Sequence, residues 1–523
     1  MDNRQAQQSS SNVMPQKGLS PSQQGILALN SMSYRMEPDL SIVIQRNVQA
    51  TYFQNQDAAP GATLTAILQT GSCFVNLRQS SLVLDVQNQS INASAGGAVS
   101  GANSSPAWFG TNGGSACNLI SRIMLTSKNG TLIERIDNCN VLSAIKVNYK
   151  YDDSWRHSVG SLMGVVMPAG ILNSGTSTTA TVSQTETAQS LGWLSASDGA
   201  TADSGAITRF VIPLYVFSTF CDSLGSLAPP QLMAGMKVEI LLENPANAMM
   251  DASPGAAGIN NKILNYHVVA CRLDLESYLL TDSVQTVLNE EASSRGLDVV
   301  SATTVDTQAQ RTNNTISVDV SRSCSRALSV VYKERVLPVA TNIAYIYGGG
   351  AFFDPMASAV YGSSLSVSYP QEFQCRAGSL YYPQSSIRGS NALTATADLF
   401  AQTLRAFQKL NVGGAGENAG AGTSLYQFKG SLTTAANVTG LNATAAGPST
   451  TPIWPTVQGG RAVFALDLQR SAILVSGLPL TNARQLNLLY TNNTSNGGPF
   501  QVDVYLTYEV VVRCFNTQVS LDI

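Results

Sequence analysis

The stretch of residues 209–249 reads RFVIPLYVFSTFCDSLGSLAPPQLMAGMKVEILLENPANAM and carries the most informative strand and turn pattern of the chain. Its apolar and β-branched residues favour one strand over Arg209–Val216 and another over Lys237–Leu242. Between them, Pro229 and Pro230 end one edge and set a rigid corner, and Gly235 permits a tight turn into the second strand. Two strands joined by a rigid corner predict a β-rich protein.

Strand patterns continue along the chain on both sides of this stretch. The clearest is a hairpin over Leu119–Ile136, where two apolar runs flank Asn129-Gly130, a dipeptide that supplies the positive φ of a tight turn. Further strands are expected at Leu77–Val86, His267–Leu275, Thr315–Val320, Ala327–Val336, Ala462–Leu468, Ala472–Val475, Gln485–Tyr490 and Val502–Arg513.

Helical patterns are few, and the two that stand out are placed alike in the two halves of the chain. Apolar residues recur at three- and four-residue spacing over Asn138–Tyr149 and over Leu393–Leu410. Each expected helix follows a strand, and the two lie roughly 250 residues apart, as a tandem duplication would place them. A polar run, Thr281–Arg295, is the expected boundary between the halves. Long stretches of small residues are expected to form surface loops at 90–114, 169–205, 413–424 and 431–451.

The composition argues for β structure and against a nucleic-acid-binding role. Charged residues make up only 12% of the chain, about half the roughly 25% of an average soluble protein. Long amphipathic helices need more charge, whereas a surface covered by copies of the same protein needs less. The net charge is −3, and the Gln- and Ser-rich arm before residue 41 is nearly neutral. We therefore expect no direct sequence-specific binding of nucleic acid. No signal peptide or long apolar run is apparent, so synthesis in the cytosol is expected.

Motifs that carry catalysis are missing from the sequence. It has only two histidines, His157 and His267, for which we expect structural or solvent-facing roles, and its eight cysteines form no C-x-x-C pair, so buried reduced thiols are expected. Residues 414–419 formally match the dinucleotide fingerprint but follow an expected helix instead of a strand. The adjacent carboxylates Asp152-Asp153 and Glu290-Glu291 do not converge on a substrate. No catalytic, cofactor-binding or metal-binding residue is predicted, and no enzyme activity or cofactor is expected.

Several segments, in their order along residues 40–520, resemble the double jelly-roll major capsid proteins of virophages, polinton-like elements and related eukaryotic DNA viruses. The passage most similar to the family is Ile212-Pro213-Leu214 followed by Leu227, the proline pair, Leu232, Gly235 and the strand 238–242. Shorter similarities lie at residues 108–110, 119–134, 140–142, 294–297, 323–327, 378–384, 465–471 and 476–480, and in the terminal VDVYLTYE.

The resemblance implies an all-β fold of two tandem eight-stranded antiparallel jelly-roll sandwiches with a few short helices and long surface loops. Residues 1–40 would be a flexible N-terminal arm, 41–285 the first jelly roll and 286–523 the second. It further implies a homotrimer that forms pseudo-hexagonal capsomers of an icosahedral virus shell, located in the virion. The expected partners are copies of the chain itself and minor capsid or penton proteins, the latter through the arm. The long Gly-, Ala- and Thr-rich insertions have no counterpart in the resemblance.

Two other functions stay open from the sequence. A glycan-binding surface or fibre-like β-sandwich would use its long loops and would be expected to carry aromatic residues there, which are scarce apart from Trp193 and Trp454. An enzyme on a β scaffold, such as a polysaccharide lyase or hydrolase, would need converging acidic residues.

Overall fold

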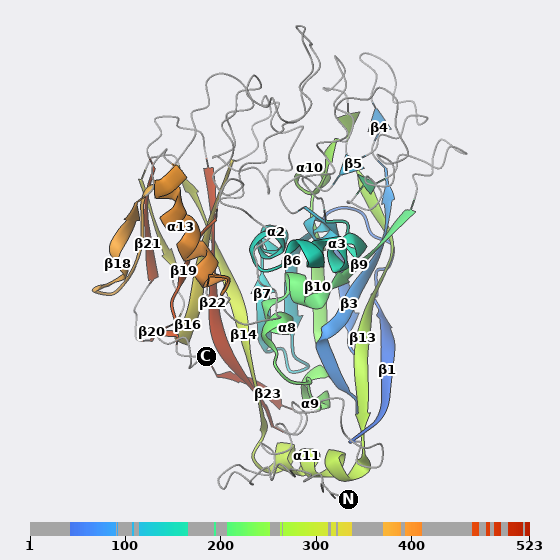
Figure 1. Ribbon diagram of the computed structural model, residues 1–523. Helices are drawn as coiled ribbons and strands as arrows, with labels where there is room; N and C mark the ends of the chain where they lie inside the picture. Colours follow the sequence, from blue (N-terminus) through green and yellow to red (C-terminus); the bar gives the residue numbers. More distant parts are fainter. Residues whose placement is uncertain are drawn as a thin grey trace, which may run out of the picture.

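A computed structural model shows the protein as two β-sandwiches standing side by side (Figure 1). It describes residues 42–89, 91–92, 107–108, 114–165, 193–194, 207–251, 262–263, 265–311, 315–320, 323–336, 370–388, 393–410, 463–469, 477–481, 486–492, 500–515 and 518–522. The N-terminal arm, the fingerprint match at 414–419, Trp454 and the strand expected over Ala472–Val475 lie outside these residues. So does most of each stretch expected to form loops.

The first sandwich consists of two four-stranded antiparallel sheets, ordered β1-β13-β3-β9 and β2-β10-β6-β7. Its strands are β1 (Val43–Tyr52), β2 (Thr63–Ile67), β3 (Phe74–Asn88), β6 (Ile120–Thr126), β7 (Leu132–Ile136), β9 (Ile207–Pro213), β10 (Lys237–Leu242) and β13 (Tyr266–Leu280).

The second sandwich repeats this arrangement, with sheets ordered β14-β22-β16-β19 and β15-β21-β17-β18. Two further strands extend the first of these sheets: β20 follows β19 along the same edge of β16, and β23 pairs with the end of β22. The strands are β14 (Leu297–Arg311), β15 (Thr315–Val320), β16 (Cys324–Val336), β17 (Pro370–Ala377), β18 (Leu380–Arg388), β19 (Phe464–Asp467), β20 (Leu478–Leu480), β21 (Leu486–Asn492), β22 (Phe500–Phe515) and β23 (Gln518–Asp522).

Both sandwiches have the jelly-roll order. Counted along each half, with β19 and β20 sharing one position, the strands pair as first-eighth-third-sixth in one sheet and second-seventh-fourth-fifth in the other. The two predicted helices, α2 (Cys139–Tyr149) and α13 (Leu393–Ala406), both lie between the fifth and sixth strands of their half. The fold class and the repeat of pattern expected from the sequence are therefore confirmed.

Other helices connect the strands or link the two rolls. The helix α11 (Asp282–Ser294) lies between the last strand of the first roll and the first strand of the second, at one end of the molecule (Figure 1). The expected strand Arg209–Val216 is too long, because Leu214–Phe217 forms the helix α7 directly after Pro213. The remaining short helices are η2 (Ala116–Leu119), α3 (Asp153–His157), α4 (Val159–Leu162), α8 (Thr219–Ser223), α9 (Pro230–Met233) and α10 (Pro245–Ala248).

Among the described residues of the first half, five two-residue strands also occur: β4 (Ile91–Asn92), β5 (Ala107–Trp108), β8 (Trp193–Leu194), β11 (Met250–Asp251) and β12 (Lys262–Ile263). They form two small sheets, β11-β5-β8 and β12-β4. Both β4 and β5 lie at the end of the first roll opposite α11 (Figure 1).

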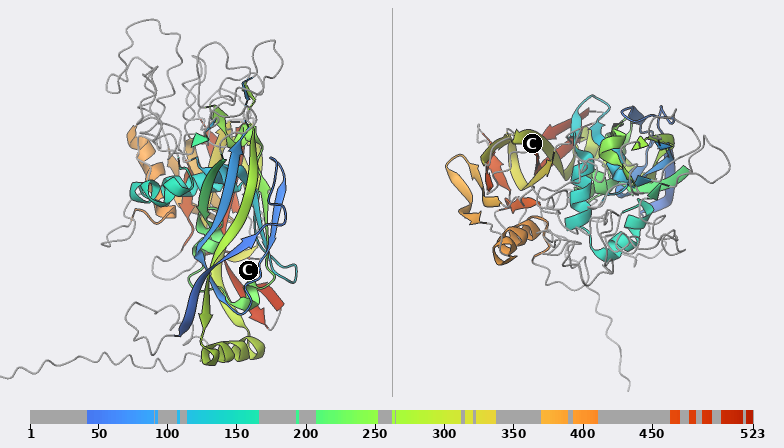
Figure 2. Two further views of the ribbon diagram at one scale, coloured as in Figure 1. Left: turned by 90° about the vertical axis from the view of Figure 1, so that its right-hand side faces the viewer. Right: turned by 90° about the horizontal axis from the view of Figure 1, so that it is seen from above.

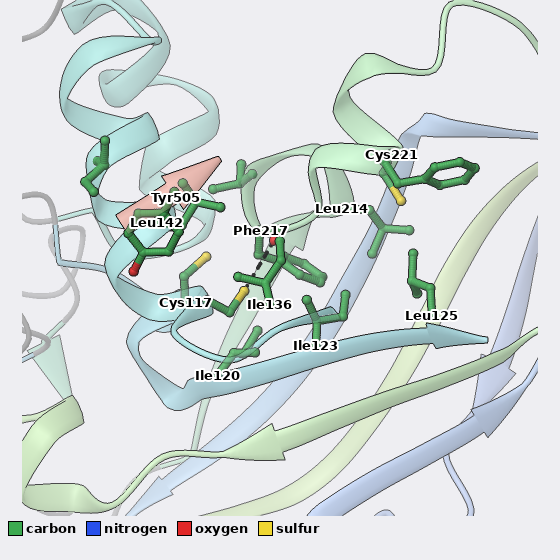
Figure 3. Packing of buried hydrophobic residues seen from close by; sticks show 14 of the residues in the cluster. Cys117, Ile120, Ile123, Leu125, Ile136, Leu142, Leu214, Phe217, Cys221 and Tyr505 are labelled. Carbon is green, nitrogen blue, oxygen red and sulfur yellow. Dashed lines mark hydrogen bonds between the residues drawn. The ribbon is translucent and has the colours of Figure 1, made fainter. Parts of the chain in front are cut away.

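Apolar side chains of the two sheets meet inside each roll. In the first roll, Ile123 and Leu125 of β6 face Leu214 and Phe217 of α7, and all four are buried (Figure 3). All eight cysteines are free and seven are buried, whereas Cys73 is partly exposed. Burial raises the pKa of Cys117, Cys221, Cys271 and Cys514 to about 12. These thiols therefore stay protonated and act as small apolar side chains.

Candidate functional site: the junction between the two jelly rolls

The densest set of long-range polar contacts lies where the two rolls meet. This junction is formed by β7, residues 137–138 and α8 of the first roll, and by β14 and β22 of the second. Figure 1 shows these elements along the middle of the molecule, between the two sandwiches. Since β7 and β14 are each the edge strand of a sheet, each roll turns an edge toward the other.

Glu134 of β7 lies at the centre of the junction and is only 1% exposed. Its carboxylate accepts hydrogen bonds from the hydroxyl of Ser218 (2.5 Å) and from the backbone N–H groups of Thr219 (3.1 Å) and Phe220 (3.0 Å). The hydroxyl of Thr303, on β14 of the second roll, donates a further bond of 3.3 Å. Glu134 thus caps the first turn of α8, whose N–H groups have no partner within the helix, and joins that turn to the other roll.

Burial raises the pKa of Glu134, because a charged carboxylate loses its water inside the junction. The bonds from Ser218, Phe220 and Thr303 and the nearby charge of Lys146 oppose this rise without cancelling it. The carboxyl group therefore keeps its proton to a higher pH than an exposed glutamate does.

A ladder of hydroxyl groups continues the junction beside Glu134. The hydroxyls of Thr219 and Thr304 lie 2.8 Å apart, and those of Thr304 and Thr507 lie 3.0 Å apart. The hydroxyl of Ser301 donates to the backbone carbonyl of Phe220 at 2.8 Å. The hydroxyl groups on the face of β14 that meets the first roll therefore form hydrogen bonds with that roll. These directional bonds favour one relative position of the two rolls.

A second polar cluster surrounds Asn138, the residue before α2. Its side chain forms no capping bond with its own helix. Instead the amide group donates to carboxylate oxygens of Asp306 (3.4 Å) and Asp503 (3.3 Å), while its backbone carbonyl accepts from the hydroxyl of Tyr505 (3.1 Å). The backbone N–H of Asp137 donates to Asp306 at 3.0 Å. Burial raises the pKa of Asp306, so this cluster also holds a desolvated carboxyl group.

Contacts at other points extend the attachment along the molecule. The rings of Tyr149 and Phe407 stack with their centroids 5.4 Å apart. The hydroxyl of Thr131 donates to the backbone carbonyl of Val519 at 2.9 Å. The two rolls are therefore attached to each other at several separate points.

The residues that the sequence singled out for chemistry do not come together in the structure. His267 lies on β13 and contacts Asp57, and His157 ends α3. Glu290 and Glu291 lie within α11, whereas Asp152 caps α3 by accepting from the N–H of Trp155 at 2.8 Å. Within the described ranges, no three His, Cys, Asp or Glu residues are grouped as metal ligands would be. None of the helices in those ranges is long and apolar enough to cross a membrane.

Sequence reasoning did not identify Glu134 or Asn138 as functional residues. In an alternating strand, the residue after the buried Ile133 would face solvent, so Glu134 would be expected to be exposed. In the structure both Ile133 and Glu134 are buried. A carboxylate there requires partners from another element, and these partners are 84 or more residues away.

The sequence matches no protein-family model and no curated protein. Similar solved structures do exist. A chain of the Sputnik virophage structure aligns with a TM-score of 0.57 and 11% identity, over 95% of this chain and 92% of that one. The mavirus major capsid protein gives a TM-score of 0.55 and 10% identity, over 100% and 96%. The Faustovirus major capsid protein gives 0.53 and 10%, over 92% of each chain. At such low identity the likeness shows the fold: this chain has the double jelly-roll architecture found in viral major capsid proteins.

Proposed function

We propose that the protein is a major capsid protein, which trimerises into pseudo-hexagonal capsomers and builds an icosahedral virus shell. The observation that carries this proposal is the pair of jelly rolls with identical strand order, fixed side by side by the junction. Three such subunits around one axis would place six similar sandwiches in a near-hexagonal outline, which tiles a closed surface. The solved structures with this fold are described as capsid proteins, which supports the same role.

The proposal assigns a part to each segment of the chain. Residues 41–285 and 286–523 would be the two wall-forming rolls. The arm 1–40 would contact neighbouring capsomers and minor capsid or penton proteins. The net charge of −3 supports a shell role without sequence-specific nucleic acid binding. The location of the mature protein would be the virion, and the protein would act as a structural subunit and not as an enzyme.

The test is the assembly state of the purified full-length chain. Light scattering coupled to size exclusion should give three times the 55.2 kDa of one chain. Negative-stain microscopy should show trefoil or hexagonal particles about 70 to 100 Å across, as expected for three two-domain subunits side by side. Monomers alone under every assembly condition would overturn the proposal, and would favour the glycan-binding or fibre-like alternative.

A further inference from the structure

A cleft of about 910 Å³ opens beside the junction, and the shell-building role leaves it unused. Its walls come from both rolls: Lys150, Tyr151 and Trp155 at the end of α2 and in α3, Tyr215 in α7, and residues 407–409 after α13. Both views show α3 and α13 on the same side of the molecule (Figures 1 and 2). The volume lies within the range of about 300 to 1,000 Å³ that is typical of small-ligand sites.

One wall of the cleft is aromatic. The rings of Tyr151 and Trp155 stack at a centroid distance of 4.1 Å, and Tyr215 meets Tyr151 edge-on at 5.8 Å. The indole N–H of Trp155 donates to the Tyr215 hydroxyl at 3.0 Å, which fixes both rings. The Tyr151 hydroxyl is buried and has no hydrogen-bond partner within the described part of the chain. A buried unpaired hydroxyl is unfavourable, and a polar group of a ligand would satisfy it.

The remaining walls carry more positive than negative charge. Arg78, Lys150 and Lys409 line the cleft together with a single carboxylate, Asp222. Asp222 is already shared between Lys150 and Lys146. Arg78 forms no ion pair with any of the residues that the structure describes. Burial removes water from the ammonium groups of Lys150 and Lys409 and so lowers the pKa of each. An anion bound beside these groups would stabilise their charged forms.

Neutral amide groups complete the lining. Asn76, Gln79 and Gln408 supply groups that both donate and accept hydrogen bonds, as the hydroxyl groups of a sugar require. Gln408 has a φ of +57°, in the left-handed region that residues other than glycine rarely adopt. The chain therefore holds an unfavourable backbone conformation at the rim of this cleft.

We propose that the cleft binds a carboxylate-bearing saccharide. The apolar C–H face of the sugar ring would lie against Trp155 and Tyr215, since the face of an aromatic ring attracts weakly positive C–H groups. Its carboxylate would meet Arg78 and Lys150 in charge-assisted hydrogen bonds. Its hydroxyl groups would bond to the amides and to the Tyr151 hydroxyl. This proposal does not depend on the capsid role.

The experiment is a calorimetric titration of the full-length chain with sialyllactose, which carries a carboxylate. Lactose is the neutral comparison, and sulfate and AMP are the competing anions. We expect saturable binding of sialyllactose that is at least about tenfold tighter than that of any of the three others. The variant Arg78→Met should weaken it by about tenfold, because one charge-assisted bond is lost. Its matched control, Arg295→Met, removes an exposed guanidinium directly after α11, far from the cleft lining, and should leave binding unchanged.

Several outcomes would overturn the proposal. Equal binding of lactose would mean that the carboxylate is not recognised. Sulfate or AMP binding as tightly would indicate a simple anion or nucleotide site. No binding, or binding that Arg78→Met leaves intact, would exclude a saccharide at this cleft. Because Arg78 is exposed and has no ion pair among the described residues, we expect the variant to keep its melting temperature, which separates loss of binding from loss of fold. None of these results alters the assembly test.

Discussion

Glu134 receives two backbone N–H groups from α8 and hydroxyl groups from Ser218 and Thr303, all inside the junction. The donors stabilise the buried carboxylate, and the carboxylate is the acceptor that these donors need. A carboxylate buried without them would be strongly unfavourable, and the donors without the carboxylate would be left unpaired.

Removal of the Glu134 carboxylate should destabilise the fold. Glu134→Ala should lower the free energy of unfolding by about 1 to 3 kcal/mol, because buried donors lose their acceptor. Glu134→Gln should cost less, since the amide oxygen still accepts. The measurement is the denaturation midpoint in guanidinium chloride, with the exposed Glu290→Ala as the matched control. Equal midpoints for Glu134→Ala and the unchanged protein would contradict this account.

The second prediction concerns pH. The folded pKa of Glu134 is raised above its usual value of 4.5. Its stabilising contribution is therefore full below that value and is lost as the pH rises through the folded pKa. Compared with Glu134→Gln, the unchanged protein should lose stability as the pH rises above 4.5 and through the raised folded pKa of Glu134. Denaturation midpoints of both proteins across this range test it. Parallel curves would show that Glu134 does not titrate abnormally.

The strand β20 can lie close to β16 because Gly477, the residue before β20, has no side chain. A Cβ atom at Gly477 would lie 2.5 Å from the carbonyl oxygen of Ala327 and 2.7 Å from the carbonyl carbon of Arg326. These are backbone atoms of β16, which cannot move aside without breaking the pairing of Ala327 with Leu478.

Gly477→Ala should therefore destabilise the second roll by about 1 to 3 kcal/mol, as overpacking does. Gly225→Ala is the matched control, because a Cβ atom there meets nothing within 4 Å. The measurement is the melting temperature of each variant in thermal unfolding. A melting temperature for Gly477→Ala equal to that of the control would rule out the close approach.

The elements that the sequence predicted well are those with one buried face. The hairpin β6–β7 turns at Asn129-Gly130, with a φ of +82° at the glycine, and β10 and β15 have the expected bounds. The strand β1 was missed because most of its residues are exposed, which removes the apolar alternation. The strand β14 was missed because Ser301, Thr303 and Thr304 are buried in a polar junction, so burial there is not accompanied by hydrophobicity.

The two rolls are joined through the polar contacts of the junction. Asn138 bridges two carboxyl groups of the second roll, Asp306 and Asp503, and Asp503 is fully buried. Without the amide, Asp306 and Asp503 would each lose one hydrogen-bond donor inside the junction.

Asn138→Ala should therefore weaken the attachment of the rolls by about 1 to 3 kcal/mol. Differential scanning calorimetry should then show the single transition of the unchanged protein broadening or dividing into two. The second substitution Asp503→Asn should restore part of the loss, because it removes the negative charge that Asp503 places near Asp306. If the double variant is no more stable than the single one, the coupling across the junction is absent.

The β-rich fold class, the helix in each half and the duplication of pattern can all be predicted from the sequence. These follow from local periodicity and turn chemistry, which a few neighbouring residues are enough to specify. The sequence does not predict that Glu134 caps a helix that begins 85 residues later, that Asn138 bonds to the other roll, or that Arg78, Tyr151 and residues 407–409 line one cleft. Such contacts depend on which strand edges meet after folding, and a partner so distant in the chain leaves no periodic trace in the sequence around the residue.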